Sequence, residues 1–305
     1  HAQQTADIMK RFEPVLDESR PVAVLVVGDV NSTIACALVA VKKGIPVIHV
    51  EAGLRSGDRS MPEEINRILT DQLSDLLFIT EADARENLKL EGIASEKVHF
   101  VGNVMIDSLR YNLTKAVPAS TTLSRASDTF GEHAQHEYGL VTLHRPSNVD
   151  DPVVLTRLLN VLANISQRTP LIFPMHPRTE ARIAAANLEG LLADSAITTI
   201  GPQGYLEMLG LMKDARVVLT DSGGIQEETT ALGVPCITLR ENTERPITVS
   251  QGTNTVVGTD VDAILACYED VMTTGGKTGR VPDLWDGESA QRIVQTLNAW
   301  ADTVE

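Results

Sequence analysis

The sequence predicts an α/β protein with two doubly wound, Rossmann-like domains. Short apolar runs rich in β-branched residues alternate with longer helical patterns, which is typical of parallel strands joined by right-handed crossovers. The chain has 305 residues, more than one typical domain, and a hydrophobic content of 43% is enough to bury a core in each of two. A polar stretch without a clear period, residues 116–137, separates two such series. We therefore expect domains at residues 1–128 and 129–286, with a terminal helix in residues 287–305 that packs back on the first.

The first series begins with an amphipathic helix at residues 6–16. Apolar runs then predict strands at residues 22–27, 46–50, 76–79 and 98–101. Between them, apolar residues recur at helical spacing, which predicts helices at residues 32–43, 63–74 and 82–90.

The second series has the same alternation and predicts a second parallel sheet. Its strands are expected at residues 138–143, 170–174, 197–200, 216–220 and 235–239. Its helices are expected at residues 153–165, 179–186, 205–213 and 225–232. Two further helices, at residues 263–272 and 289–301, close the chain.

Charge and cysteine content restrict the partners and the compartment. The formal net charge of −15 argues against a nucleic acid or an anionic membrane as partner, because either would repel the surface as a whole. An anionic ligand therefore needs a local positive pocket. Cys36, Cys236 and Cys267 are far apart and form no CxxC pair, so we interpret them as buried thiols in a reducing compartment and expect a soluble, cytoplasmic protein.

The stretch at residues 220–228 predicts a phosphate-binding site. It ends a buried strand and opens a helix with Ser222, Gly223 and Gly224, where unpaired amides, the helix dipole and the lack of side chains favour an anion. Glu228 lies about one turn further on, where its carboxylate can accept hydrogen bonds from two vicinal hydroxyls, such as those of a ribose. Together these residues suggest a nucleotide ligand. The alternative is that Ser222 only caps the helix and that the acidic residues complement its dipole.

Polar residues also follow other predicted strands, at the sheet edge where open α/β sheets bind ligands. Asp29 follows Gly28 after one strand, although it could instead be the N-cap of the next helix. Glu51 ends another strand beside the flexible Gly53, where folding has little need of a carboxylate. Two sheets that offer such loops across a cleft indicate a nucleotide-sugar enzyme of the glycosyltransferase-B type. No GxGxxG follows a strand, so a dehydrogenase has little support.

Charged residues elsewhere are less informative on their own. Glu63 and Arg67 lie four apart on a predicted helix and could form a surface ion pair worth only about 0.2–0.5 kcal/mol. Among the arginines, Arg245 is best placed to neutralise a diphosphate, because it lies in a loop after a strand and its guanidinium can bind phosphate oxygens in pairs.

The sequence predicts neither a metal site nor a cofactor. His144 and His176 each end an apolar strand, and neither has a partner at metal-ligand spacing. The triplet at residues 260–262 imitates the DxD metal motif of another glycosyltransferase class, but it precedes a helical run. We therefore expect Asp260 to cap that helix.

Taken together, these motifs strongly resemble the non-hydrolysing UDP-N-acetylglucosamine 2-epimerase family. The resemblance runs nearly end to end, and six motifs in the right order are far more specific than any one of them. It implies a glycosyltransferase-B fold, a homodimer, and an isomerase that interconverts UDP-GlcNAc and UDP-ManNAc for polysaccharide precursors. The motifs that carry it are residues 28–29, 49–58, 62–67, 141–145, 220–228 and 243–246.

The resemblance also implies roles for individual residues. The C2 hydrogen of the sugar is a very weak acid, so UDP must begin to leave before a carboxylate can remove that proton; UDP then returns as a proton reaches the opposite face. Asp29, Glu51 and Glu63 resemble the family's catalytic acids, without an assignment to either face, and Arg67 and His144 resemble residues that organise the site. The positions that match UDP-binding residues, with uracil, phosphate and ribose as targets, are Gln203, Ser222, Gly223, Gly224, Glu228 and Arg245.

Two departures from the family keep alternatives open. Met208 stands where many members have an aromatic residue near the base. The family also opens with a strand and a Gly-Thr-Arg-Pro-Glu loop that nothing here matches, so we expect the first domain to be incomplete at its start. A nucleotide-sugar-binding fragment without turnover and a glycosyltransferase of the same architecture remain alternatives. If the chain is an epimerase, the identity of its sugar is not determined by these motifs. Relatives act on other N-acetylated UDP sugars, including diacetamido uronic acids.

Overall fold

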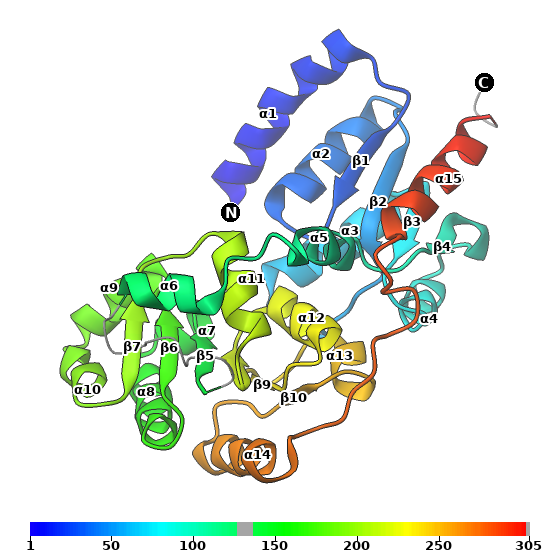
Figure 1. Ribbon diagram of the computed structural model, residues 1–305. Coiled ribbons are helices and arrows are strands. Elements are labelled where there is room, and N and C mark those ends of the chain that lie inside the picture. Colours follow the sequence, from blue (N-terminus) through cyan, green and yellow to red (C-terminus); the bar gives the residue numbers. More distant parts are fainter. Residues whose placement is uncertain (127–136, 303–305) are drawn as a thin grey trace. The chain divides into compact units, whose positions relative to one another are not determined.

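A computed structural model describes residues 1–126 and 137–302 (Figure 1). The chain divides into two compact units, His1–Asp107 with Asp283–Glu305, and Ser108–Pro282. The boundaries expected from the sequence, at residues 128 and 286, stay a prediction of where the folding domains divide. No helix in the described ranges is long and apolar enough to cross a membrane.

The first unit contains a four-stranded parallel sheet in the order β1-β2-β3-β4. Leu25 of β1 pairs with Ile48 of β2. β2 and β3 are buried on both faces, as the near-continuous apolar runs predict, whereas β1 alternates buried and exposed residues, with Leu25 45% and Val27 49% exposed. The strands are β1 (Val24–Val27), β2 (Val47–Ala52), β3 (Leu76–Ile79) and β4 (Val98–Phe100).

Helices cover this sheet on both faces. α1 packs on α2 and α2 on α3, while Ile293 of α15 joins a core cluster with Ile48 and Val50 of β2. Trp285, just before α15, is buried and donates from Nε1 to the Thr80 carbonyl at 3.0 Å. The helices are α1 (Ala2–Ser19), α2 (Asn31–Lys42), α3 (Pro62–Leu73), α4 (Ala84–Leu90), the 3-10 turn η1 (Ser95–Lys97), α5 (Val104–Leu113), which continues into the second unit, and α15 (Ser289–Ala301).

The second unit contains a six-stranded parallel sheet in the order β10-β9-β8-β5-β6-β7. The order reverses direction at β5, so the loops after β5 and β8 diverge there and leave room for a ligand. The strands are β5 (Gly139–Thr142), β6 (Leu171–Pro174), β7 (Ile197–Ile200), β8 (Val217–Thr220), β9 (Cys236–Thr238) and β10 (Asn254–Val256).

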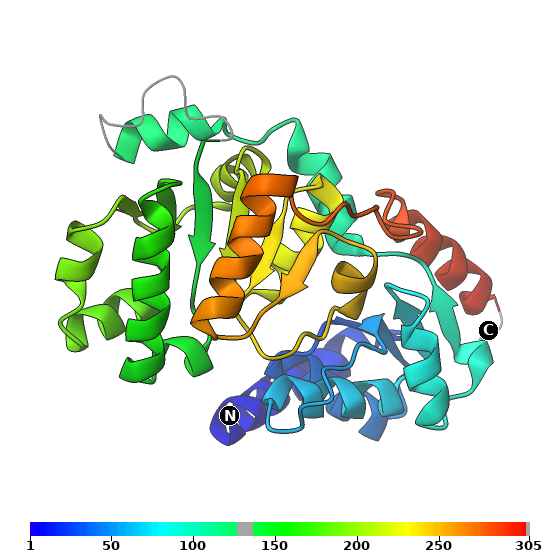
Figure 2. The same cartoon turned by 90° about the horizontal axis from the view of Figure 1, so that it is seen from below.

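Two core clusters fill the opposite faces of this second sheet. α8 and α14, green and orange in Figure 2, lie side by side and supply much of one cluster. α6 and α11 supply much of the other. The helices are α6 (Ala119–Ala126), α7 (Pro146–Val149), α8 (Pro152–Ser166), α9 (Pro177–Ala185), α10 (Glu189–Ala193), α11 (Tyr205–Lys213), α12 (Gly223–Leu232), α13 (Pro246–Ser250) and α14 (Val261–Thr274).

All nine predicted strands are confirmed. Some segments that were expected to be irregular, however, form helices or strands. Part of the expected linker, residues 116–137, is helix α6, whose Leu123 is buried against the second core; residues 127–136 lie outside the described residues. The sequence also missed α5 and the strand β10, whose three residues include the polar Asn254 and Thr255. Only Cys236 is a buried thiol, whereas Cys36 and Cys267 are half-buried.

We expect Trp285→Ala to lower the free energy of unfolding by about 3–5 kcal/mol, because it removes a fully buried indole and its hydrogen bond. Chemical denaturation followed by circular dichroism measures this change. The matched control is Val294→Ala on the exposed side of α15, which should change stability by less than about 0.5 kcal/mol. Equal losses in the two variants would show that the indole does not anchor this segment.

Candidate functional site

Asp29 and Arg67 form a partly buried ion pair in the first unit. Asp29 follows β1, and its Oδ2 accepts a hydrogen bond from Arg67 Nε at 3.1 Å as well as one from Nη2. Val30 rather than Asp29 is the N-cap of α2, so the interpretation of Asp29 as a helix cap is wrong. Asn66 holds the same turn by donating to the Asp29 carbonyl at 2.9 Å.

Arg67 does not form the surface pair with Glu63 that the four-residue spacing suggested. Its side chain is only 3% exposed, and its Nη1 donates to Glu64 Oε2 at 2.9 Å. Glu64 also accepts the backbone N–H groups of Ser56 and Gly57, so it fixes the loop between β2 and α3. Glu63 is half-buried on the first turn of α3 and lines a cavity of about 230 Å³ with Asn66 and Asn31.

Glu51 has a strained backbone. Its φ is 73°, in the left-handed region, and the pairing of β2 with β3 shifts register between Val50 and Ala52. Such a conformation costs a residue with a side chain on the order of 1–3 kcal/mol and is retained mainly where function needs it. The Glu51 Oε2 atom lies 3.6 Å from where a Cβ would stand on Gly28. The strain therefore aims this carboxylate at the turn that carries Asp29.

The predicted phosphate site in the second unit opens α12. Ser222 is the N-cap residue, but its side chain makes no capping hydrogen bond, so the interpretation that it serves only as a cap is not supported. A Cβ on Gly223 would lie 2.5 Å from Glu244 Oε1, which explains why glycine is required there. Glu227 is fully buried and pairs with Arg245 at 2.9 Å, so it does not complement the dipole from the surface.

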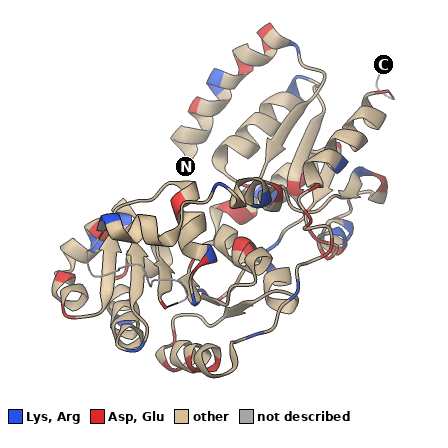
Figure 3. Cartoon of the chain, viewed as in Figure 1, with Lys and Arg blue, Asp and Glu red and all other residues tan. Residues whose placement is uncertain are grey.

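Arginines give this acidic chain a local positive region beside α12. The chain has 41 acidic residues against 26 Lys and Arg, and Figure 3 shows acidic residues, coloured red, on many helices. Here the balance is reversed, because three arginines share two buried glutamates: the residues are Arg145, Arg240, Arg245, Glu227 and Glu244. Burial opposes ionisation of Glu244, but Arg245 and Arg240 outweigh it and lower its pKa to about 2. Among these five residues the arginines outnumber the glutamates by one, and the buried Asp221 carboxylate lies beside them.

His144 is oriented by a buried carboxylate that the sequence reasoning did not select. Its Nδ1 lies 3.0 Å from Asp221 Oδ1, and Asp221 also accepts the backbone N–H groups of His144 and Arg145 and a bond from Asn148 Nδ2. Burial tends to raise the pKa of Asp221, yet these hydrogen bonds hold it below the usual value. With Nδ1 donating to Asp221, Nε2 is the nitrogen that can act on a ligand. The position of Asp221, directly after β8, was the available signal.

Glu228 is in α12, and Gln203 is in the turn before the neighbouring helix α11. Glu228 is 7% exposed, and Tyr205 at the start of α11 donates to its Oε1 at 2.9 Å. Burial raises the pKa of Glu228, and the Tyr205 bond only partly opposes this. Gln203 is half-buried and donates to the Gly201 carbonyl at 2.7 Å, within the turn that leads into α11. Tyr205 therefore links the Gln203 turn to Glu228.

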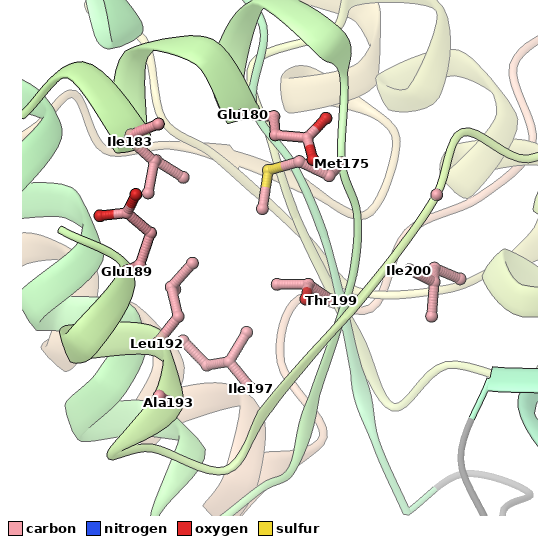
Figure 4. A pocket seen from close by; sticks show the side chains of 11 residues that line it. Met175, Glu180, Ile183, Glu189, Leu192, Ala193, Ile197, Thr199 and Ile200 are labelled. Atoms are coloured by element: carbon pink, nitrogen blue, oxygen red, sulfur yellow. The ribbon is translucent and has the colours of Figure 1, made fainter. Parts of the chain in front are cut away.

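One other prediction concerns a residue outside this site. Asp260 caps α14 by accepting from Ala263 N at 2.9 Å, which confirms its structural role. A cavity of about 490 Å³ lies between α9, α10 and β7 and is lined by Met175, Glu180 and Leu192 among others (Figure 4). No predicted site residue contributes to it. The described part of the chain also holds no cluster of three or more His, Cys, Asp or Glu side chains arranged for a metal ion.

The structure therefore brings the predicted residues into two sets, each within its own unit. The first set is Asp29, Glu51 and Arg67, with Glu63 on the helix that carries Arg67. The second set is gathered in the segments that follow β5, β7, β8 and β9 and consists of His144, Gln203, Ser222, Gly223, Gly224, Glu228 and Arg245.

The fold and these sets define a two-unit α/β protein of the glycosyltransferase-B type. A crystal structure of UDP-GlcNAc 2-epimerase from Methanocaldococcus jannaschii, in complex with UDP-GlcNAc and UDP, aligns with a TM-score of 0.86 at 41% identity, over 98% of this chain and 82% of that one. The family model for UDP-N-acetylglucosamine 2-epimerase matches residues 1–298. This chain belongs to the UDP-N-acetylglucosamine 2-epimerase family.

Two curated relatives are equally similar but carry different names. A UDP-N-acetylglucosamine 2-epimerase from Methanococcus maripaludis is 42% identical over 97% of this chain and 81% of its own length. A UDP-2,3-diacetamido-2,3-dideoxy-D-glucuronate 2-epimerase from Pseudomonas aeruginosa is also 42% identical, over 97% of this chain and 80% of its own length. Overall identity therefore does not distinguish the sugar. The expected incompleteness at the start of the first domain stays a prediction.

We expect Glu228→Gln to stabilise the protein at neutral pH. The folded carboxyl has a raised pKa, so above that pKa its ionisation costs more in the folded state than in the unfolded state. The gain from glutamine should be present at pH 7 and disappear below the ordinary carboxyl pKa, where both states are protonated. Urea denaturation at both pH values measures it, with Glu180→Gln on exposed α9 as the control that should show no such trend. A Glu228→Gln protein that is less stable at pH 7 would contradict the cause given for this shift.

Proposed function

We propose that this chain is an isomerase that interconverts UDP-GlcNAc and UDP-ManNAc by inverting the sugar at C2. The observation that carries the proposal is the strained Glu51 beside the turn of Asp29, because C2 inversion needs carboxylates that can exchange a carbon-bound proton. Family membership and the likeness to an epimerase crystallised with UDP-GlcNAc and UDP support it.

In this proposal the second unit holds UDP. The diphosphate sits on the amides at the start of α12, with Ser222, Gly223 and Gly224 around it and Arg245 beside it. Glu228 accepts the ribose hydroxyls and Gln203 contacts uracil. His144 Nε2 supports the diphosphate as the C1–O bond breaks, since Asp221 fixes the orientation of the ring. Asp221 is the one residue added to the predicted set. It acts by orienting His144 and is not itself a UDP ligand.

The first unit carries the proton chemistry. As UDP leaves, positive charge on the sugar ring acidifies the C2 hydrogen, and a carboxylate removes it to give a glucal and bound UDP. Return of UDP with a proton from the opposite face completes the inversion. Asp29, Glu51 and Glu63 are the candidates for these transfers. Arg67 holds Asp29 in place, because two of its nitrogens donate to one carboxylate oxygen.

A second candidate is the same reaction on a UDP-linked diacetamido glucuronate. The Pseudomonas aeruginosa enzyme named for that substrate is as similar to this chain as the Methanococcus maripaludis enzyme named for UDP-GlcNAc. The two substrates share the nucleotide and the C2 position, so the residues above would act in the same way. A glycosyltransferase is less well supported, because it does not need three carboxylates for proton transfer.

We further propose a cytoplasmic homodimer that supplies polysaccharide precursors. The cytoplasmic assignment is supported by three free cysteines in the described residues and by a nucleotide-sugar substrate, which is made inside cells. The dimer follows from the resemblance to the family alone.

The test is incubation with UDP-GlcNAc in deuterated water, followed by proton NMR at C2 of the sugar. Formation of UDP-ManNAc with deuterium at C2 would establish epimerisation by proton exchange. Exchange with the diacetamido glucuronate but not with UDP-GlcNAc would identify the second candidate. Binding of UDP without exchange on either sugar would favour the binding fragment without turnover.

We expect Asp29→Asn and Glu51→Gln to abolish exchange while the dissociation constant for UDP changes little, because both residues lie in the unit that carries the proton chemistry. Each variant should lose at least about 10²-fold in kcat. Glu228→Gln should do the opposite and weaken UDP binding by about 10–100-fold, since it removes hydrogen bonds to a charged group. Isothermal titration with UDP and the deuterium assay separate these effects, and Glu86→Gln on exposed α4 is the control that should alter neither. Loss of UDP binding in Glu51→Gln would contradict the division of roles.

A further inference from the structure

The carboxylates of the first unit depend on a buried histidine that none of the roles above includes. His49 is on β2, is fully buried, and makes hydrogen bonds with both ring nitrogens. Nδ1 lies 2.6 Å from Asp71 Oδ1, and Nε2 lies 2.9 Å from the carbonyl oxygen of Gly28. The first partner is on α3 and the second is in the turn after β1, so one ring ties three elements together.

The partners of His49 decide where its protons are. A carbonyl oxygen only accepts hydrogen bonds, so Nε2 must carry a proton. An ionised carboxylate also only accepts, so Nδ1 carries one too when Asp71 is ionised. Asp71 Oδ2 accepts from the Gly53 N–H at 3.1 Å and lies 2.7 Å from Arg55 Nη2, and both donors favour the ionised carboxylate.

The charges around the ring agree with this assignment. Arg55 binds Glu91 through two hydrogen bonds, at 2.8 and 2.6 Å, and also contacts Asp71. With a neutral imidazole, this cluster would hold two carboxylates and one guanidinium and so carry a net negative charge, shared between the buried Asp71 and Glu91, which is 27% exposed. A protonated His49 makes the cluster neutral, which is what burial of charged groups requires.

The pair also holds the backbone on both sides of the predicted catalytic carboxylates. His49 binds the carbonyl of Gly28, the residue before Asp29, and Asp71 binds the N–H of Gly53, two residues after Glu51. Gly28 and Gly53 both have positive φ, at 69° and 78°, so neither turn is held by the ordinary preference of the chain. The strained Glu51 lies between His49 and Gly53, and these two bonds oppose its relaxation.

We propose that His49 is a positioning residue whose doubly protonated ring, paired with Asp71, fixes the turn of Asp29 and the strained backbone of Glu51 for proton transfer at C2. The kinetic part of this inference rests on the proposed function; the protonation of the ring does not. His49 touches neither substrate nor a reacting atom, and it acts through the two backbone segments.

The first test is the protonation of the ring, read by NMR on protein labelled with nitrogen-15 at histidine. Both nitrogens of His49 should show protonated-type shifts at neutral pH, because each faces an acceptor. His99 in the same unit is the internal reference: burial and Arg85 lower its pKa, so it should show one unprotonated nitrogen. His49→Gln and His99→Gln assign the two signals. An unprotonated Nδ1 on His49 would overturn the proposal, because the proton would then be on Asp71.

The second test separates the two bonds of the ring. Glutamine can place its amide nitrogen where Nε2 was and keep the bond to Gly28, whereas asparagine reaches only the Nδ1 position. We therefore expect His49→Asn to lower kcat by roughly a hundredfold, with KM nearly unchanged, and His49→Gln to lower it clearly less. His99→Gln is the control and should keep wild-type kcat.

The outcomes separate a positioning role from general instability and from failure of the proposed function. Circular dichroism and UDP binding confirm that each variant is folded, and only folded variants enter the kinetic comparison. Wild-type kcat in folded His49→Asn, or equal losses in the two variants, would overturn the positioning role. If the wild-type protein shows no epimerisation at all, the proposed function fails, while the NMR experiment still decides the charge on His49.

Discussion

The parallel arrangement of the strands is the constraint on which the rest of the structure depends. Parallel strands bring their carboxyl ends to one edge of a sheet, so residues distant in sequence meet there. In the first unit this edge gathers the turn of Asp29 and the strained Glu51; in the second it gathers His144, Asp221 and the start of α12. The helices packed on each sheet hold its strands, and therefore the loops at this edge, in place. The chemistry then depends on short loops whose backbone is held by buried polar groups.

Buried charges that lie against partners of opposite sign hold these loops. Arg67 donates hydrogen bonds to Asp29 and Glu64. Asp71 contacts His49 and Arg55 and accepts a hydrogen bond from the Gly53 N–H. Removing one partner of such a pair leaves a charge without compensation in a low-dielectric interior, which costs far more than a surface ion pair contributes. The second unit differs in one respect, because its arginines outnumber their glutamates. This local excess of arginine favours the binding of an anion to a chain that is acidic as a whole.

The sequence predicted the sheets and the site positions better than it predicted the contacts. Continuous apolar runs predict the strands and helical spacing predicts the helices, so both can be located without a structure. The ends of the predicted strands then indicate Asp29, Glu51 and His144 as site residues. The partners of these residues were not readable. Asp71 is a carboxylate without a local signature, and the position of Asp221 directly after β8 does not reveal its partner; the role of each appears only when chain segments 22 and 77 residues apart are brought together. The Glu63–Arg67 spacing predicted the wrong pair, because the Arg67 side chain is buried and pairs with Asp29 instead.

The strain at Glu51 shows why a fold of this kind needs such partners. A residue held at φ 73° would relax if the chain around it could move, so the cost on the order of 1–3 kcal/mol must be offset by contacts that exist only in the strained state. The Gly53 N–H bond to Asp71 and the Gly28 N–H bond to the Val50 carbonyl hold the backbone on either side of Glu51. They stabilise the local geometry rather than the fold as a whole. Catalytic placement and backbone strain are therefore two consequences of the same set of hydrogen bonds, and a change in any of them alters both.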